Sequence, residues 1–417
     1  MTNSDKTSQT KPSLRNLPRN VWAVSFTSFF MDISSEMVLN LLPLFMANVL
    51  NVGTAVIGVI EGLAEATASL LKLFSGWLSD KLQGRKWLAV LGYGLSALSK
   101  PFFIVDNIWV IAAARWSDRV GKGIRTSPRD ALVADSIDEK QRGMAFGFHR
   151  AADTAGAMLG ILIALIVIWL MHLDFGTSVN SLSDNTFHTI VYISLVPAVL
   201  AVLSLAIGAR DTRVKTQRTL PKFALKSLGK EFLIFIGIVS IFTLGNSSDA
   251  FIVLRAQDTG LNLIGITAML VVFNMVYSLI STPAGILSDR IGRKRLIIGG
   301  WLVYGVIYTG FALSSQPWHV FVLYVLYGIY YGMAYGTSLA LVADIVPENL
   351  RGTAYGTYNG IVGILSFPAS VIAGTLWQGI GAWKGFGAPA PFFFGGGMAI
   401  LAAILLLLWN PKKKLVE

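Results

Sequence analysis

Residues 76–86 read GWLSDKLQGRK, and residues 285–294 repeat the pattern as GILSDRIGRK. The similarity continues downstream, where ALVAD occurs at 131–135 and again at 340–344. Asp80 and Asp289 are separated by 209 positions, and so are Asp135 and Asp344. A constant spacing over separate segments indicates that the chain consists of two homologous halves.

The composition is that of a membrane protein. Apolar residues make up 54% of the chain, charged residues only 14%, and the mean hydropathy is +0.62. A soluble protein of this size would expose more charge. We therefore expect an all-α membrane protein, with twelve transmembrane helices in two pseudo-symmetric six-helix bundles. The predicted spans are 21–49, 56–79, 87–105, 108–134, 143–171, 189–209, 232–255, 264–288, 296–314, 318–345, 353–379 and 391–410.

The distribution of basic residues predicts the orientation. Of 34 Lys and Arg, 24 fall in tails and loops on the side of the termini, and Lys384 alone falls in a loop on the other side. The positive-inside rule then places both termini in the cytoplasm. We also expect the chain to lie in a bacterial inner membrane and to be a monomer. The same rule accounts for the net charge of +11, so nucleic acid is not an expected partner. The predicted parts are a tail (1–20), a bundle (21–209), a basic linker (210–231), a second bundle (232–410) and a tail (411–417).

The repeated loop also carries a family resemblance. G-x-L-x-D-R-x-G-R-K between the second and third helices of each half resembles the signature loop of the major facilitator superfamily. The second copy fits without a gap, and the first contains one extra residue, Gln83. The resemblance implies two bundles around a central cavity lined by helices 1, 4, 7 and 10, which open alternately to the two sides. It also implies gating roles for residues of the repeated segments, namely Asp80, Arg85, Asp135, Asp289, Arg293 and Asp344.

The fourth span is unusually charged. At 100° per residue, Arg119, Lys122 and Arg129 project within about 40° of Arg115, and Arg125 about 80° away. Each cation costs ~2.5–3.5 kcal/mol or more near a helix centre unless it is paired or faces water. Internal ion pairs with Glu61 and Glu65 are one explanation. Because this span has more cations than nearby acids, we instead predict that these five cations bind substrate.

The second half lacks this charge. A shift of 209 maps Arg115, Asp118 and Lys122 onto Tyr324, Tyr327 and Tyr331. A charged wall would therefore face an aromatic wall able to hydrogen-bond or stack. We predict that Tyr327 and Tyr331 contact substrate, together with Arg255 near the outer end of helix 7.

Acids in the spans are candidates for proton coupling. Ser34-Ser35-Glu36 on helix 1 resembles Ser247-Ser248-Asp249 on helix 7, and Asp32 lies one helical turn before Glu36. A buried carboxyl group can bind a proton near neutral pH. Ordinary helix packing, with each acid in a salt bridge, is the alternative. Residues 119–123 (RVGKG) resemble the helix 4 motif that the family uses in proton coupling, which implies a coupling role for Arg119.

These features favour a secondary transporter of a small organic anion, because cations in a low-dielectric cavity bind carboxylate or phosphate groups well. We expect proton-coupled import of a polycarboxylate or a carboxylate-type siderophore. A proton-antiport exporter of drugs or metabolites is the first alternative, because Gly147, Gly156 and Gly160 keep part of the helix 5 motif of drug exporters. A receptor or scaffold that does not transport is the second.

Signatures of enzymes are missing from the sequence. It contains no H-E-x-x-H, G-x-S-x-G or P-loop pattern, and no cysteine. The four histidines (His149, His172, His188 and His319) are isolated from one another. We therefore expect no enzymatic activity, no cofactor and no metal site.

Overall fold

The computed structural model describes residues 17–410, apart from 83, 138–141, 212–227 and 348–349. The first half contains α1 (Arg19–Leu39), α2 (Leu42–Asn48), α3 (Thr54–Lys81), α4 (Arg85–Ser99), the 3-10 helix η2 (Lys100–Ile104), α5 (Ile108–Asp135), α6 (Arg142–Phe175) and α7 (Asp184–Gly208). The second half contains α8 (Lys230–Gly245), α9 (Ala250–Asp258), α10 (Leu263–Ile291), α11 (Arg293–Leu313), α12 (Pro317–Ile345), α13 (Arg351–Gln378) and α14 (Ala390–Leu408).

The helices confirm the predicted membrane fold. Within the described residues, eleven segments are long and apolar enough to cross a membrane. Three of them combine two consecutive elements, namely α1 with α2, α4 with η2, and α8 with α9. The twelfth predicted span is α5, which has 28 residues but is too charged to qualify by composition. Its charge therefore needs partners inside the protein.

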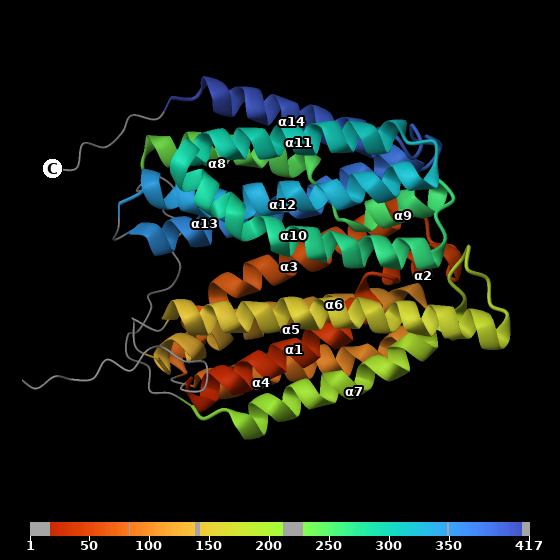
Figure 1. The fold of residues 1–417 in the computed structure, drawn as a ribbon, viewed down its shortest axis with the longest axis horizontal. Coiled ribbons are helices and arrows are strands. Elements are labelled where there is room, and N and C mark those ends of the chain that lie inside the picture. The colour runs from red at the N-terminus through yellow and green to blue at the C-terminus, as the bar shows by residue number, and fades with distance from the viewer. Residues whose placement is uncertain (1–16, 83, 138–141, 212–227, 348–349, 411–417) are drawn as a thin grey trace, which may run out of the picture.

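The two halves form two bundles that lie side by side in Figure 1. Helices α1 to α7 form one bundle, and α8 to α14 form the other. α1 begins and α14 ends at the same end of the molecule, on the left of the view. The predicted tails and the predicted linker lie largely outside the described residues, which exclude 1–16, 212–227 and 411–417.

Three helices begin with a side-chain cap at the end opposite the described termini. Asn107 Oδ1 accepts a hydrogen bond from Trp109 N at 2.9 Å at the start of α5. Ser183 caps α7 through Thr186 N, and Asn262 caps α10 through Gly265 N. Each cap satisfies an N–H group of a first turn, which has no partner within its own helix.

The first helix of each half is interrupted. α1 ends at Leu39 and α2 begins at Leu42, while α8 ends at Gly245 and α9 begins at Ala250. Side chains bind the backbone groups that the second break frees. Tyr304 donates to Gly245 O at 3.0 Å, and Ser370 Oγ accepts from Ser248 N at 3.2 Å. Irregular backbone inside a membrane needs such partners and usually lies beside an internal cavity.

The bundles contact each other through α3 and α13, through α6 and α10, and through α2 and α9. Glycines bring α3 and α13 close together, because a Cβ at Gly58 would lie 2.3 Å from the carbonyl oxygen of Ser370. At the end far from the described termini, Leu263 N donates to Val179 O at 2.7 Å. Ala55 N also donates to Gln378 Oε1 there, at 3.1 Å. The bundles are therefore joined at this end.

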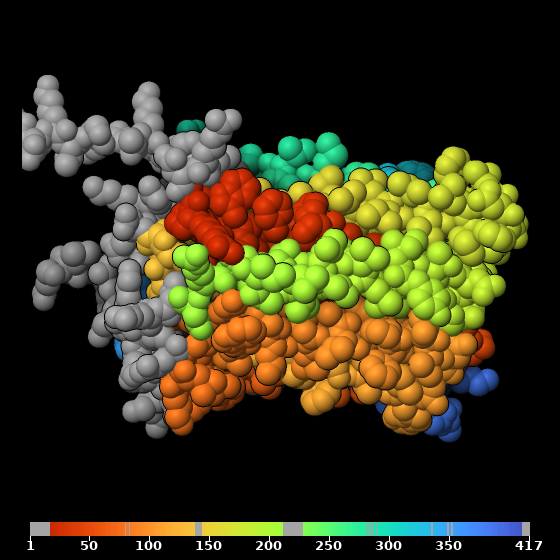
Figure 2. Space-filling model, turned by 90° about the horizontal axis from the view of Figure 1, so that it is seen from below, coloured from red at the N-terminus to blue at the C-terminus, as the bar shows by residue number. Residues whose placement is uncertain are grey.

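One outer face of the first bundle consists of α1, α7 and α4. Figure 2 shows α7 lying between α1 and α4 on this face. A shallow groove of about 430 Å³ runs between α1 and α7 and is lined mainly by apolar side chains. Its position on the outer surface makes it a contact for the bilayer and not the predicted central site.

Candidate functional site

Helix α5 is fixed between α3 and α4 by close contacts at two glycines. A Cβ at Gly121 would lie 2.5 Å from the carbonyl oxygen of Gly92 on α4. A Cβ at Gly123 would lie 2.5 Å from Leu71 Cβ on α3. These contacts leave no room for side chains, and they fix the direction in which the cations of α5 project.

Arg115 forms a two-point ion pair with Glu61 on α3. Its Nε lies 3.0 Å from Oε1 and its Nη2 lies 2.6 Å from Oε2. Both side chains are buried, with exposed fractions of 4% and 5%. A bidentate pair of this kind satisfies the carboxylate strongly. The prediction of substrate contact is therefore corrected for Arg115, which has an internal partner.

Arg119 belongs to a wider network. Its Nη1 lies 3.3 Å from Glu65 Oε1 and its Nε lies 3.7 Å from Asp118 Oδ2. The buried amine of Lys100 lies 3.9 Å from Asp118 and donates to Ser35 Oγ on α1 at 3.2 Å. Glu65 is the accessible member, with 42% of its side chain exposed. The network thus extends from the core to an open surface.

The two cations nearer the end of α5 also have partners. Arg125 donates to Ser96 Oγ and lies over the ring of Tyr93 at 4.5 Å from its centroid. Arg129 pairs with Asp130 at 2.9 Å and donates to Ser28 Oγ at 3.2 Å. A cation over an aromatic face is stabilised without losing its charge to an acid. Among the described residues no acid forms an ion pair with Arg125, although Asp118 and Asp32 lie within electrostatic range of it.

Lys122 differs from the other four cations of α5, each of which has a side-chain partner in the structure. Its side chain is half-buried, and its amine forms no hydrogen bond or ion pair with any residue that the structure describes. Asp32 and Glu65 lie within electrostatic range of it without ion-pair contact. A charge in this position is costly unless water or a ligand reaches it.

Helix α1 presents two acids to the same region. Asp32 is half-buried and has no hydrogen bond or ion pair within the described part of the chain. Its charged neighbours are Asp153, Glu36, Lys122 and Arg125. Glu36 accepts a hydrogen bond from Asn40 Nδ2 at 2.8 Å. The structure therefore places Asp32 of α1 within electrostatic range of Lys122 and Arg125 on α5, with Glu36 beside Asp32.

On the other bundle, Asp249 lies at the break between α8 and α9. Tyr327 donates its hydroxyl to Oδ1 at 3.2 Å, and Tyr331 donates to Oδ2 at 3.4 Å. Asp249 and Tyr331 are half-buried. Glu65 of the first bundle is within electrostatic range of Asp249. The predicted acid and both predicted tyrosines thus form one unit facing the first bundle.

Two predicted contacts need correction. Tyr327 is fully buried among aromatic rings that include Tyr304 and Tyr324, so only its hydroxyl group has a role at Asp249. Arg255 is buried as well. It donates to the carbonyl oxygens of Phe311 at 3.1 Å and Ser314 at 2.7 Å, and it pairs with Asp258. Arg255 therefore binds the C-terminal end of α11 instead of facing an open site.

The repeated segments produce matching ion pairs. Arg85 Nε lies 2.6 Å from Asp135 Oδ2, and Arg293 Nη1 lies 2.9 Å from Asp344 Oδ1. Each described pair joins helices of one bundle, and the gating roles that the resemblance implies for these residues stay a prediction. The side chains of Asp80 and Asp289 lie outside those that the structure describes.

The turns that contain these arginines differ in the two halves. Gly292 has φ of 94°, whereas Gly84 is extended with φ of −135°. The first loop has one more residue than the second, and its backbone at Gly84 has a different conformation from the backbone at Gly292.

Asn40, which donates to Glu36 at the break in the first helix, is not among the predicted site residues. A signal was present, because the repeat spacing of 209 maps Asp249 onto Asn40. Both positions lie at interruptions of pseudo-equivalent helices. The Ser-Ser-acid similarity favours a different alignment and hides this match.

Comparisons with known proteins agree with this architecture. A family model described as Major Facilitator Superfamily matches residues 24–254 and 233–417. An MFS-type transporter of Methanocaldococcus jannaschii, described as uncharacterized, is 36% identical over 400 residues, or 94% of this chain and 95% of that protein. A cis,cis-muconate transport protein of Acinetobacter baylyi is 22% identical over 347 residues, or 77% of this chain and 79% of that protein.

Solved structures share the fold at low identity. A mutant of the nucleoside transporter NupG has a TM-score of 0.78 at 14% identity and covers 93% of this chain and 99% of its own. The POT family transporter PepTSo has a TM-score of 0.73 at 13% identity, with 95% and 98% covered. At these identities the likeness shows the fold alone.

Proposed function

Because this chain belongs to the major facilitator superfamily, we propose that it is a secondary active transporter of a small organic anion. In this proposal the anion binds between the bundles, in the region between α5 and the broken helix α8–α9. Alternating access then carries it across the membrane. The chain is a multi-pass membrane protein, and we place it in an inner membrane as a monomer with cytoplasmic termini.

One observation carries the choice of an anion. Lys122 is a half-buried cation with no partner among the described residues, whereas Arg115 and Arg119 have acids in contact. An anionic group near Lys122 would supply the missing charge. Arg125 adds a second positive charge that is not paired with an acid. Because Arg115 and Arg119 are paired with acids, the proposed anion site consists of Lys122 and Arg125, with Arg119 at its edge.

The relative from Acinetobacter baylyi supports the same class of solute. It is described as a cis,cis-muconate transport protein, and muconate is a dicarboxylate. At 22% identity this supports a class of substrate and not a particular one. A polycarboxylate, including a carboxylate-type siderophore, and a phosphorylated solute all carry anionic groups that two such cations could bind.

We further propose that the coupling ion is a proton and that transport is import. Asp32, Glu36 and Asp249 are half-buried acids in which no cation contacts the carboxylate within the described residues. Protonation of such a group removes a charge that is costly in a low-dielectric region. In this proposal Arg119 links anion binding to proton coupling. Its partner Glu65 is an electrostatic neighbour of both Lys122 and Asp249.

Export of drugs or metabolites remains the main alternative, and the glycines of α6 weaken it. A Cβ at Gly156 would lie 2.4 Å from Phe29 O, and one at Gly160 would lie 2.5 Å from Ile33 O. These glycines are therefore explained by the packing of α6 against α1, without an export motif.

The test uses purified protein in proteoliposomes. We expect an inward proton gradient to drive accumulation of a radiolabelled organic anion from a panel that includes cis,cis-muconate, tricarboxylates and sugar phosphates. Counterflow without a gradient should exchange the same solute. Gradient-driven accumulation of cationic drugs in inverted vesicles would favour an exporter instead. A failure to exchange any solute, by protein that is folded, would favour a receptor or scaffold.

A further inference from the structure

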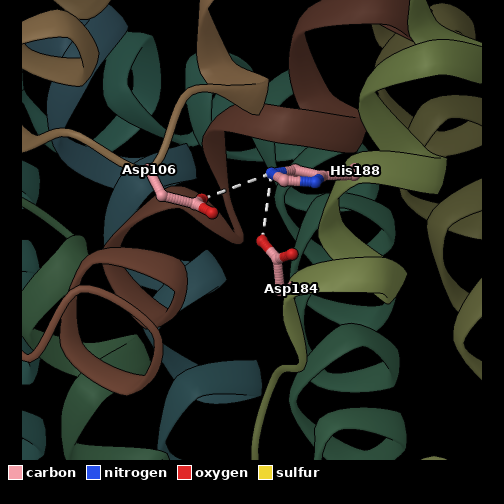
Figure 3. A group of neighbouring side chains, drawn as sticks. All are labelled: Asp106, Asp184 and His188. Carbon is pink, nitrogen blue, oxygen red and sulfur yellow. Dashed lines mark ion pairs between the residues drawn. The ribbon is translucent and has the colours of Figure 1, made fainter.

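A second polar cluster lies far from the central charges, at the outer end of the first bundle (Figure 3). It consists of Asp106, in the turn between η2 and α5, and of Asp184 and His188 at the start of α7. His188 Nε2 lies 3.1 Å from Asp184 Oδ1 and 3.5 Å from Asp106 Oδ1. In Figure 3 both carboxylates point toward this one ring nitrogen.

The side chains of this cluster are partly exposed, with exposed fractions of 18% for His188, 41% for Asp184 and 53% for Asp106. Nε2 of His188 and Oδ1 of Asp184 are themselves shielded from solvent, and they contact each other as an ion pair without forming a hydrogen bond to any described residue. The ring of Phe45 lies 5.9 Å from the imidazole and limits its movement. A shielded polar atom without a hydrogen bond is unfavourable, and an ion bound between these two atoms would satisfy both of them.

The spacing of the three ligand atoms fits a metal ion. The imidazole nitrogen and one oxygen from each carboxylate all lie within 4.8 Å of one another. Ligand atoms at ~2.0–2.2 Å from a tetrahedral zinc ion are roughly 3.3–3.5 Å apart. The two distances from His188 Nε2, 3.1 and 3.5 Å, are close to this value.

We propose that Asp106, Asp184 and His188 bind a divalent transition-metal ion of the zinc type. Nε2 of His188 and one oxygen of each aspartate are the three protein ligands, and water takes the fourth position. An imidazole ligand favours zinc and its neighbours over magnesium and calcium, which prefer oxygen. The ion also separates two carboxylates that would otherwise repel each other.

The bound ion would tie two elements together. Asp106 directly precedes α5, the helix that carries Lys122, and Asp184 and His188 begin α7. A metal bridge therefore fixes the outer end of α5 against α7. The role is structural and independent of the identity of the transported solute, so it does not rest on the proposed function.

The competing explanation is an ion pair in which protonated His188 bridges the two aspartates. It predicts the same three residues but no affinity for metal. The two explanations therefore differ in one measurement on the wild-type protein, which needs no variant that could misfold.

Full-length protein in detergent, stripped with EDTA, would be titrated with Zn²⁺ by calorimetry and with Co²⁺ by visible absorption. We expect one Zn²⁺ per chain and the d–d absorption of tetrahedral Co²⁺, with much weaker responses to Mg²⁺ and Ca²⁺. His188→Gln should lower the affinity for Zn²⁺ by more than about tenfold, since even the loss of outer-shell partners costs that much. Asp106→Asn should weaken binding as well.

His172→Gln is the matched control, because His172 is an exposed histidine near the same end of the bundle. It should bind Zn²⁺ as the wild type does. If folded wild-type protein binds no Zn²⁺ at millimolar concentration, the ion-pair explanation holds and the metal site is rejected. Equal loss of affinity in His172→Gln and His188→Gln, or no loss in either, rejects it too.

Discussion

The guanidinium of Arg115 on α5 binds the carboxylate of Glu61 on α3 through two contacts, at 3.0 and 2.6 Å. Both side chains are buried, so loss of one partner leaves an uncompensated charge inside the bundle. We expect Glu61→Gln to destabilise the protein by about 3–5 kcal/mol, or to prevent folding. Thermal unfolding of the purified variants in one detergent measures this.

Glu65→Gln is the control for that experiment. Glu65 also contacts Arg115, at 3.5 Å, but 42% of its side chain is exposed, so its loss should cost much less. A double change, Glu61→Gln with Arg115→Met, should recover part of the lost stability because no charge is then left buried. Equal effects of Glu61→Gln and Glu65→Gln would contradict the assignment of a structural pair.

Lys122 has the opposite character, since its amine has no partner within the described residues. We expect Lys122→Glu to abolish uptake of the anion while membrane insertion and the melting temperature stay near those of the wild type. Lys122→Arg should keep part of the activity because it keeps the charge. Proteoliposome uptake, with the melting temperature as the folding check, tests both expectations.

Lys384→Glu makes the same charge change at an exposed position in the loop between α13 and α14. It should leave uptake unchanged. If the Lys122→Glu variant takes up the anion normally, α5 is not part of the binding site. Only the assignment as a transporter of unspecified substrate then stands.

Asp249 and Glu36 give a prediction about pH. If either acid carries the coupled proton, then Asp249→Asn or Glu36→Gln should flatten the dependence of active uptake on external pH. Wild-type import should rise as external pH falls, because more protons are available to load the site. Counterflow should survive in the coupling variant, since exchange of solute needs no net proton movement. Retention of the pH dependence by both variants would place the proton site elsewhere.

Tyr327 provides a further test of the proposed role of Asp249 in proton coupling. Its hydroxyl donates to Asp249 at 3.2 Å, while its ring is buried in the aromatic core. Tyr327→Phe should keep the fold and shift the pH profile of uptake, because a donor to the carboxylate form is lost. An unchanged profile with normal uptake would separate Tyr327 from the coupling reaction.

The membrane fold could be predicted from the sequence because its cause is composition and repetition. Long apolar segments must be helices in lipid, and the repeat gives the two bundles without reference to any contact. The charged character of α5 was equally visible. The sequence could not show which residues pair, because nothing in it indicates that Glu61 and Arg115, 54 positions apart, are in contact.

The same limit explains why some contacts were not predicted. Besides its ion pair with Asp258, Arg255 binds backbone carbonyls at the end of α11, which no residue type reveals. Asp106 and His188 are 82 positions apart, so the histidine looked isolated until the fold joined α7 to the turn before α5. Periodicity predicts the direction of a side chain on its own helix, but not what a neighbouring helix places opposite it.

The repeated ion pairs predict a shared structural role. Arg85 binds Asp135 at 2.6 Å, and Arg293 binds Asp344 at 2.9 Å, at matching places in the two bundles. We expect Asp135→Asn to cost more stability than Asp344→Asn, because Asp344 is the more exposed acid, at 51% against 16%. Melting temperatures of the two variants test the order. The reverse order would show that the Arg293–Asp344 pair contributes more to stability than the Arg85–Asp135 pair, despite its greater exposure.

Two glycines of α6 distinguish packing from an export motif. A Cβ at Gly156 would lie 2.4 Å from Phe29 O on α1, whereas a Cβ at Gly147 would meet nothing within 4 Å. If packing is the reason for these glycines, Gly156→Ala should destabilise the protein by about 1–3 kcal/mol through overpacking. Gly147→Ala should be neutral or slightly stabilising, because alanine favours the helix. Melting temperatures and uptake rates of the two variants, measured side by side, give the comparison. A loss of transport in Gly147→Ala at unchanged stability would favour a functional motif and, with it, an exporter.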